Sequence, residues 1–359
     1  MDKFSFTSIQ GLTEVFYCNE PYLPPLKNKN AIYIADTNTA QIVRSSENFS
    51  SSIPFVIIDC GEENKNFTSL ELILKTALDS NLTRQAVFIG IGGGVVCDLT
   101  AFAASVYMRG VKCILVPTTV LAMADASIGG KTAINFHNYK NMVGSFFKAD
   151  EIYISTKVLH TLEEKEYLSG LAEILKIALL YSPSLYRIFN TEKSKILKRD
   201  ETIVLEIIRR AVIAKSNVVV RDFYEKGERA FLNFGHTFAH ALERVCNFSI
   251  THGQAVLWGI CRALKLGEKL KITSPDYADE IINLIKDYGF CTDTVSLFAD
   301  TSVTSSEKDL KINFADKIVN AMKKDKKNTG NNIKLILQKN IEETIIFEAD
   351  EKDIKEVLI

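Results

Sequence analysis

The sequence predicts an α/β N-terminal domain built on a parallel sheet, followed by a mostly α-helical C-terminal domain. In residues 1 to about 150, short β-branched runs alternate with runs of helical periodicity, which is typical of parallel strands joined by helices. From about residue 160 the apolar period becomes helical and mostly stays so. Because 359 residues exceed one ordinary core, we expect two domains, 1–157 and 158–359.

The elements follow from apolar runs and their flanking residues. Buried strands are expected at 31–35, 54–59, 86–91 and 112–117. Helices are expected at 68–78, 95–107, 163–180, 201–219, 232–246, 253–270, 276–288 and 306–322. Thr68, with Glu71 three residues later, is the expected N-cap of the first of these helices. A short β-hairpin is expected from 333–337 and 344–347.

Composition provides no indication of a nucleic-acid or membrane partner. The formal net charge is −1, which provides no electrostatic argument for nucleic acid or membrane, so an anionic substrate would need local clusters of Lys and Arg. The seven cysteines form no CxxC pair, which favours reduced, packed thiols in a cytosolic protein. The first residues have no apolar signal segment, and no apolar run reaches about 18 residues, so neither a signal peptide nor a membrane helix is expected.

Three of the five histidines lie close together in the sequence. His236 and His240 are four residues apart in an apolar helical run, so both imidazoles would project from one helix face. His252 follows, just before another long helix, and Glu173 in a further helical run could add a carboxylate. Isolated histidines usually pack in cores or lie at the surface. Three within one short segment favour a metal or acid–base site, because a catalytic zinc takes three protein ligands.

A glycine-rich turn joins the third expected strand to its helix at Gly90-Ile-Gly-Gly-Gly94. Such a turn either is simply tight or lets backbone amides approach a phosphate at a helix N-terminus. Asp98 and Thr118-Thr119 would lie at the same edge of the sheet, which favours a dinucleotide site.

A polar segment, Asp125-Ala-Ser-Ile-Gly-Gly-Lys-Thr132, lies between the two expected domains in the sequence. Its Gly-Gly-Lys-Thr resembles the end of a P-loop, but Asp125 stands where that motif requires a glycine. We expect a flexible charged loop, which is either an ordinary surface loop or part of an active site; Lys140-Asn141 and the cation of Arg109 are close in sequence.

A set of motifs, in the same order and with near-identical spacing, resembles the 3-dehydroquinate synthase family from about residue 30 onward. The motifs are Gly92-Gly-Gly-Val-Val-Cys-Asp98, Pro117-Thr-Thr119, Asp125 to Thr132, Lys140-Asn-Met142, Gly170-Leu-Ala-Glu-Ile-Leu-Lys176, Glu225-Lys-Gly-Glu-Arg229, Asn233-Phe-Gly-His-Thr237, His240, His252-Gly253 and Asp325-Lys-Lys327. The resemblance implies an NAD- and zinc-dependent homodimer, with Co²⁺ as an alternative metal. It would convert 3-deoxy-D-arabino-heptulosonate 7-phosphate to 3-dehydroquinate and phosphate in the shikimate pathway.

The resemblance also implies roles for individual residues. The zinc ligands would be Glu173, His236 and His252. The positions around NAD, in the N-terminal domain for the most part, would be Asp36, Glu62, Lys65, Gly93, Gly94, Asp98, Thr118, Thr119, Lys131, Lys140, Thr161, Leu162 and Glu166. The positions around the substrate would be Asp125, Lys131, Lys140, Asn141, Lys176, Lys215, Arg229, Asn233, His240 and Lys326, and Arg109 would reach a neighbouring subunit's site.

The same comparison identifies departures and rivals. Gln254, Tyr139, Cys97 and Met123 stand where the family usually has Glu, Gly, Gly and Gln, and Gln254 bears on a charge near the metal. Sibling cyclases that make a valiolone or a deoxyinosose are the nearest alternatives, but the retained Lys131, Asn141 and His240 favour dehydroquinate. A metal-dependent polyol dehydrogenase and a non-catalytic binding protein are more distant alternatives.

Overall fold

The computed structural model describes residues 1–26, 29–137, 139–294, 297, 307–323 and 332–358. The chain divides into two compact units. Unit 1 consists of Met1–Gly170 and Arg199–Gly227, and unit 2 consists of Leu171–Lys198 and Glu228–Ile359. Each unit therefore contains two separate stretches of the sequence. The division into continuous domains at 1–157 and 158–359 stays a prediction.

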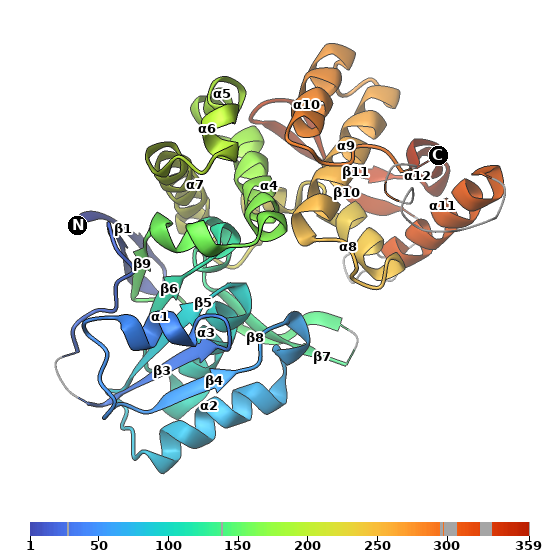
Figure 1. The fold of residues 1–359 in the computed structure, drawn as a ribbon. Coiled ribbons are helices and arrows are strands. Elements are labelled where there is room, and N and C mark those ends of the chain that lie inside the picture. Colours follow the sequence, from blue (N-terminus) through green and yellow to red (C-terminus); the bar gives the residue numbers. More distant parts are fainter. Residues whose placement is uncertain (27–28, 138, 295–296, 298–306, 324–331, 359) are drawn as a thin grey trace. The chain divides into compact units, whose positions relative to one another are not determined.

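Unit 1 contains a seven-stranded sheet in the order β1-β2-β9-β6-β5-β3-β4 (Figure 1). Its central strands are parallel and nearly completely buried, because helices cover a sheet of this kind on both faces. The strands are β1 (Asp2–Ser8), β2 (Gly11–Tyr17), β3 (Ala31–Asp36), β4 (Phe55–Ile58), β5 (Val87–Gly92), β6 (Lys112–Pro117) and β9 (Glu151–Ile154). β1 is antiparallel to β2, and β2 is parallel to β9. The expected strands at 31–35, 54–59, 86–91 and 112–117 correspond to β3 to β6.

The helices of unit 1 are α1 (Ala40–Ser45), α2 (Phe67–Asp79), α3 (Gly94–Val106) and α7 (Glu201–Arg221), with the first residues of α4 (Glu164–Tyr181). The expected helices at 68–78 and 95–107 are α2 and α3. The expected cap of α2 is wrong: Asn66, not Thr68, is the N-cap, and its side chain accepts from the amide of Ser69 at 3.0 Å.

The polar segment expected to be a loop instead ends in a hairpin. Residues Ala122–Ala126 form a wide helical turn, after which β7 (Lys131–Phe136) pairs with β8 (Tyr139–Phe146) in a two-stranded sheet. The inward residues Thr132 and Ile134 alternate with more exposed ones, and Thr132 Oγ1 donates to the carbonyl of Asp98 on α3 at 2.6 Å. Packing against α3 therefore gives this polar stretch a strand conformation that its composition did not indicate.

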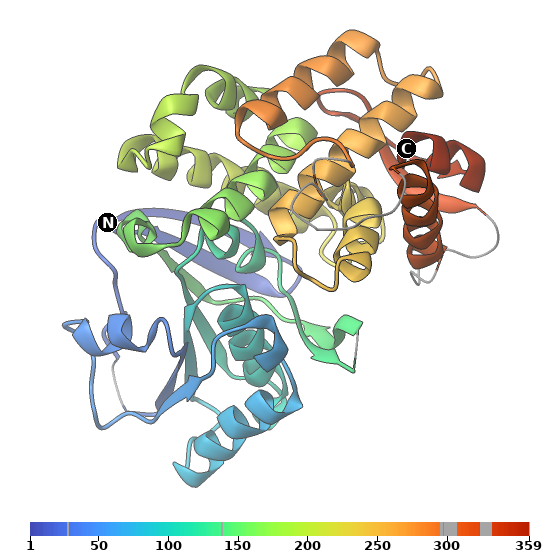
Figure 2. The same cartoon turned by 45° about the vertical axis from the view of Figure 1, so that its right-hand side comes forward.

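Unit 2 is mainly helical. It contains the rest of α4, then α5 (Pro183–Thr191), α6 (Lys193–Leu197), α8 (His236–Val245), α9 (His252–Lys269), α10 (Pro275–Asp287), α11 (Glu307–Lys323), α12 (Glu351–Leu358) and a hairpin of β10 (Ile333–Asn340) and β11 (Glu343–Ala349) (Figure 2). The expected fold class, a parallel-sheet α/β domain followed by a helical one, is confirmed. None of the described helices is both long and apolar enough to cross a membrane.

One expected helix of unit 2 begins later than its periodicity suggested. Residues Glu228–Asn233 form 3₁₀ turns, and α8 starts only at His236. Between them Gly235 has a left-handed φ of 78°, and a Cβ there would lie 2.7 Å from the carbonyl oxygen of Val256 on α9. The close approach of α8 to α9 therefore requires glycine at this position.

Candidate active site

Three helices of unit 2 bring the expected metal ligands together. Glu173 of α4, His236 of α8 and His252 of α9 each offer one ligand atom, and these atoms lie within 4.8 Å of one another. Glu173 Oε1 is 3.6 Å from His236 Nε2 and 3.5 Å from His252 Nε2. Two ligand atoms that each lie about 2.0–2.2 Å from a tetrahedral zinc are about 3.3–3.6 Å apart. The distances from Glu173 to the two imidazoles therefore match the spacing of zinc ligands.

The carboxylate of Glu173 is fully buried, and its two oxygens differ. Oε2 accepts from Nζ of Lys176, one helical turn later, at 2.5 Å. Among the residues that the structure describes, Oε1 has no hydrogen-bond partner, and it lies 3.6 Å and 3.5 Å from the Nε2 atoms of His236 and His252. A buried carboxylate oxygen without a partner is costly, so this atom fits a role as a metal ligand.

The charges around this carboxylate favour its ionised form. Burial would raise the pKa of Glu173, but the ammonium of Lys176 and the imidazoles of His252 and His236 hold that pKa well below its usual value. Burial and the Lys176 charge together keep the pKa of His236 well below its usual value, so this imidazole is neutral. Ionised carboxylate and neutral imidazole are the forms that bind zinc. At His252, burial is outweighed by the carboxylates of Glu173 and Glu243, which raise the pKa to about 9, so a metal ion there would replace a proton.

Three other expected residues of unit 2 lie on α8 or in the 3₁₀ turns that precede it. His240, one turn along α8, has its ring centroid 5.4 Å from that of His236 but is not in the three-residue ligand group. Arg229 is 2% exposed, and Asn233 Nδ2 donates to the carbonyl of Ala230 at 3.0 Å. Lys326 lies outside the described residues.

Residue Glu243 of α8 was not singled out by the sequence. Its Oε1 lies 3.2 Å from His252 Nδ1, and the residue is 2% exposed. The only signal was its spacing, because it follows His236 by seven residues, two helical turns, and so lies on the same face.

In unit 1, several expected NAD positions meet at one edge of the sheet. β3, β5 and β6 are adjacent parallel strands that end at Asp36, Gly92 and Pro117. The amide of Thr118 donates to the carbonyl of Gly92 at 2.9 Å, so the ends of β5 and β6 are joined. Asp36 Oδ1 accepts from the amide and the hydroxyl of Thr39, which closes a tight turn after β3.

Packing requires glycine at one position of this edge, Gly92, but not at another, Gly94. A Cβ on Gly92 would lie 2.5 Å from Val96 Cγ2, so Gly92 is required by the packing of α3. A Cβ on Gly94 would meet only Ala126, at 3.7 Å, so packing does not require glycine there. Gly93, the N-cap of α3, provides no side-chain cap to the first-turn amides. These amides and the open space at Gly94 suit a phosphate group.

Lys65 joins an expected cofactor residue to an expected substrate residue. It is 4% exposed, and its Nζ donates to Asp98 Oδ2 and to Asn141 Oδ1. Burial disfavours the ammonium, but the carboxylates of Asp98 and Glu62 outweigh it and raise the pKa of Lys65. Glu62 is itself held by Asn135, whose Nδ2 donates to Glu62 Oε1 at 2.9 Å. Lys65 therefore holds Asp98 and Asn141 in fixed positions.

Two further expected cations of unit 1, Lys215 and Lys131, are paired with acids. Lys215 of α7 is buried, and its Nζ donates to the Asp125 carboxylate at 2.6 Å and to its carbonyl at 2.5 Å. Lys131, at the start of β7, forms an ion pair with Glu225, which adopts a left-handed φ of 56°. Glu225 is the first residue of the family motif Glu225-Lys-Gly-Glu-Arg229, but the sequence alone indicated no role for it.

Other expected positions are placed without forming a group. Lys140 and Arg109 are exposed. Thr161 ends a 3₁₀ segment, Leu162 caps it, and Glu166 lies in the first turn of α4.

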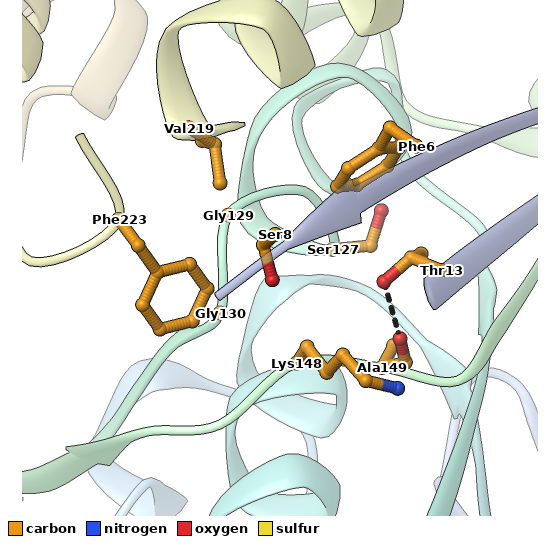
Figure 3. A pocket seen from close by; sticks show the side chains of 10 residues that line it. All are labelled: Phe6, Ser8, Thr13, Ser127, Gly129, Gly130, Lys148, Ala149, Val219 and Phe223. Carbon is orange, nitrogen blue, oxygen red and sulfur yellow. Dashed lines mark hydrogen bonds between the residues drawn. The ribbon is translucent and has the colours of Figure 1, made fainter. Parts of the chain in front are cut away.

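Beneath the turn before β7, a cavity of about 10 Å³ is bordered by Ser127, Gly130 and eight further residues (Figure 3). That volume suits about one water molecule, not a coenzyme.

The fold is that of sugar-phosphate cyclases. It matches a solved 2-deoxy-scyllo-inosose synthase complexed with carbaglucose-6-phosphate, NAD⁺ and Co²⁺, at a TM-score of 0.85, with 22% identity and 99% of both chains covered. It also matches 2-epi-5-epi-valiolone synthase from Streptomyces hygroscopicus with NAD⁺ and Zn²⁺ bound, at a TM-score of 0.80, with 22% identity and coverage of 96% of this chain and 95% of the other.

The sequence comparisons are more specific. The family models described as 3-dehydroquinate synthase N-terminal and C-terminal match residues 55–169 and 170–328. A 3-dehydroquinate synthase from Acetivibrio thermocellus is 34% identical over 329 residues, 90% of this chain and 87% of the relative. One from Francisella tularensis is 35% identical over 305 residues, 84% of this chain and 80% of the relative. The chain belongs to the 3-dehydroquinate synthase family.

Proposed function

We propose that this chain is a 3-dehydroquinate synthase that converts 3-deoxy-D-arabino-heptulosonate 7-phosphate to 3-dehydroquinate and inorganic phosphate. Family membership supports the reaction class. The structural observation that carries the proposal is the buried Glu173 carboxylate, whose unpartnered Oε1 faces two imidazole Nε2 atoms. Such a group can hold a metal and leave a position open for substrate oxygens.

The proposed cofactors are NAD and Zn²⁺, with Co²⁺ as an alternative. Structural neighbours bind NAD⁺ together with Co²⁺ or Zn²⁺. Glu173, His236 and His252 would hold the metal, while the first turn of α3 and the ends of β3, β5 and β6 would hold NAD. Bound NAD supplies a hydride acceptor and donor, and bound zinc supplies a Lewis acid for a carbinol oxygen.

The remaining expected residues would bind and orient the substrate. His240, beside His236, is the candidate to accept and return the proton of the carbinol hydroxyl, because imidazole changes its protonation near neutral pH. Lys131 and Lys326 are proposed to bind the phosphate, and Lys215 and Arg229 to bind the carboxylate. In unit 1, Lys131 is paired with Glu225 and Lys215 with Asp125.

The main alternatives share the fold. A cyclase that makes a deoxyinosose or a valiolone is suggested by the neighbours, and a polyol dehydrogenase by a probable glycerol dehydrogenase from Sinorhizobium meliloti, which matches at a TM-score of 0.64 and 12% identity. We favour dehydroquinate because the curated relatives at 34–35% identity carry that name.

A single experiment separates these functions. The purified protein is incubated with NAD⁺, Zn²⁺ and 3-deoxy-D-arabino-heptulosonate 7-phosphate, while phosphate release and absorbance at the NADH wavelength are followed together. A 3-dehydroquinate synthase releases phosphate without net NADH. In parallel samples with other substrates, net NADH formed from glycerol would identify a dehydrogenase. Phosphate release only from another sugar phosphate, such as glucose 6-phosphate, would identify a sibling cyclase.

We also propose a homodimer in the cytoplasm. Unit 1 exposes several large apolar side chains, among them Phe67, Leu78, Val106 and Met108. Met108 and the neighbouring Arg109 both have left-handed φ, and strained, exposed residues are common at functional sites. Together these features support an interface at which Arg109 would act.

All seven cysteines are free thiols, which supports a reducing compartment. Light scattering on the purified chain would test the dimer.

A further inference from the structure

We propose that Glu243 is a positioning residue that orients His252 for metal binding. Its carboxylate Oε1 lies 3.2 Å from His252 Nδ1, and Glu243 is 2% exposed in the packed interior of unit 2. This inference rests on the proposed metal role of Glu173, His236 and His252, and it assigns a fourth residue to that site.

The geometry determines which nitrogen of His252 faces the ligand group. A carboxylate accepts hydrogen bonds and cannot donate one, so Nδ1 of His252 carries the proton that it donates to Glu243. In the neutral ring Nε2 then keeps its lone pair, and Nε2 is the atom that lies 3.5 Å from Glu173 Oε1. The Glu243 carboxylate therefore selects the tautomer that can bind a metal at the correct atom.

His236 provides an internal comparison. Its Nδ1 lies 3.2 Å from the carbonyl oxygen of Phe234, a neutral acceptor in its own chain segment. His252 instead lies at the first position of α9, directly after the cap residue Thr251. The acceptor for His252 comes from a different helix, α8. A carboxylate there also adds negative charge behind the ligand, which increases the basicity of the imidazole.

A purely structural role is the alternative, because a buried acid on α8 that pairs with α9 could simply hold the two helices together. The two roles predict different measurements. A structural tie affects the stability of the metal-free protein and leaves metal affinity unchanged. A positioning residue affects metal affinity, and partners of this kind typically change it by about 10–100-fold.

The experiment compares Glu243→Gln with the parent protein and with Glu280→Gln, an exposed acid of α10 that accepts from the Tyr186 hydroxyl at 2.6 Å. Zinc affinity is measured by competition with a coloured chelator, and thermal unfolding is measured with and without zinc. The visible spectrum of the Co²⁺ form reports ligand geometry. Glu243→Gln should weaken zinc binding about 10–100-fold and reduce the rise in Tm caused by zinc. Glu280→Gln should leave both unchanged.

Two outcomes would overturn the inference in distinguishable ways. If the parent binds zinc and Glu243→Gln binds it equally tightly, Glu243 is structural and the proposed function is unaffected. If the parent itself binds neither Zn²⁺ nor Co²⁺, the proposed metal role fails together with this inference. Glu243→Gln keeps the size of the side chain, and Glu243→Asp, which keeps the charge, serves as a second variant with partial recovery of zinc affinity expected.

Discussion

The side-chain amide of Gln254 makes two hydrogen bonds with the backbone of Cys291. Its Nε2 donates to the Cys291 carbonyl at 2.9 Å, and its Oε1 accepts from the Cys291 amide at 3.0 Å. A carboxylate could accept from the amide but could not donate to the carbonyl. The residue that departs from the family pattern therefore connects the first turn of α9 to the chain that follows α10.

Replacing Gln254 with Glu should destabilise unit 2. The substitution removes the donor to the Cys291 carbonyl and places a negative charge beside that oxygen, which should cost about 1–3 kcal/mol. The free energy of unfolding in urea, compared among Gln254→Glu, the parent and the exposed-site control Gln85→Glu, provides the measurement. Equal stability of Gln254→Glu and the control would show that the paired hydrogen bonds contribute little.

Alanine substitutions at two glycines of the turn before α3 should affect stability and NAD affinity separately. Gly92→Ala should lower stability by about 1–3 kcal/mol, because the added Cβ meets Val96 at 2.5 Å. Gly94→Ala has room for its Cβ, so it should fold normally but bind NAD more weakly, on the order of tenfold. Unfolding curves and NAD titration measure the two effects. Unchanged NAD affinity in Gly94→Ala would argue against the α3 N-terminus as the phosphate site.

Replacing His252 with Ala should abolish metal retention and turnover together, because the site has three expected ligands and loses one. His160→Ala is a matched control, since His160 is exposed and pairs with Glu201 in unit 1. Metal content after dialysis and phosphate release are measured on the same samples. A fully metallated and active His252→Ala protein would contradict the assigned ligand set.

The thiols should differ sharply in reactivity. Burial raises the pKa of Cys97 and of Cys113, and it raises the pKa of Cys261 to about 12. A raised pKa keeps a thiol protonated at pH 8, and the protonated form is a poor nucleophile. Iodoacetamide at pH 8 should therefore label exposed Cys60 first, as mass spectrometry of the native protein can check. Labelling of Cys97 at a similar rate would indicate that the α3 region opens readily.

Much of the architecture could be predicted from local sequence patterns. Alternation of β-branched and helical runs identified β3 to β6 with α2 and α3, because the two periods of side-chain direction are properties of the segment itself. Spacing and residue type indicated a metal or acid–base site at His236, His240 and His252, with Glu173 as a possible carboxylate, and the family resemblance implied the set Glu173, His236 and His252 that the structure groups together.

Only the tertiary structure decided which partners these residues have. Lys131 begins a strand because β7 packs on α3, and α7 belongs to unit 1 although it follows most of that unit after a gap in the sequence. Lys65 holds Asp98 and Asn141, and Glu243 reaches His252, across separations that no local pattern reports. The sequence by itself therefore determined the type of the strongly periodic elements and the residue types from which a metal site can be built. The tertiary structure determined the pairing of buried polar groups, because most buried donors and acceptors are satisfied by whatever group the fold brings within about 3 Å.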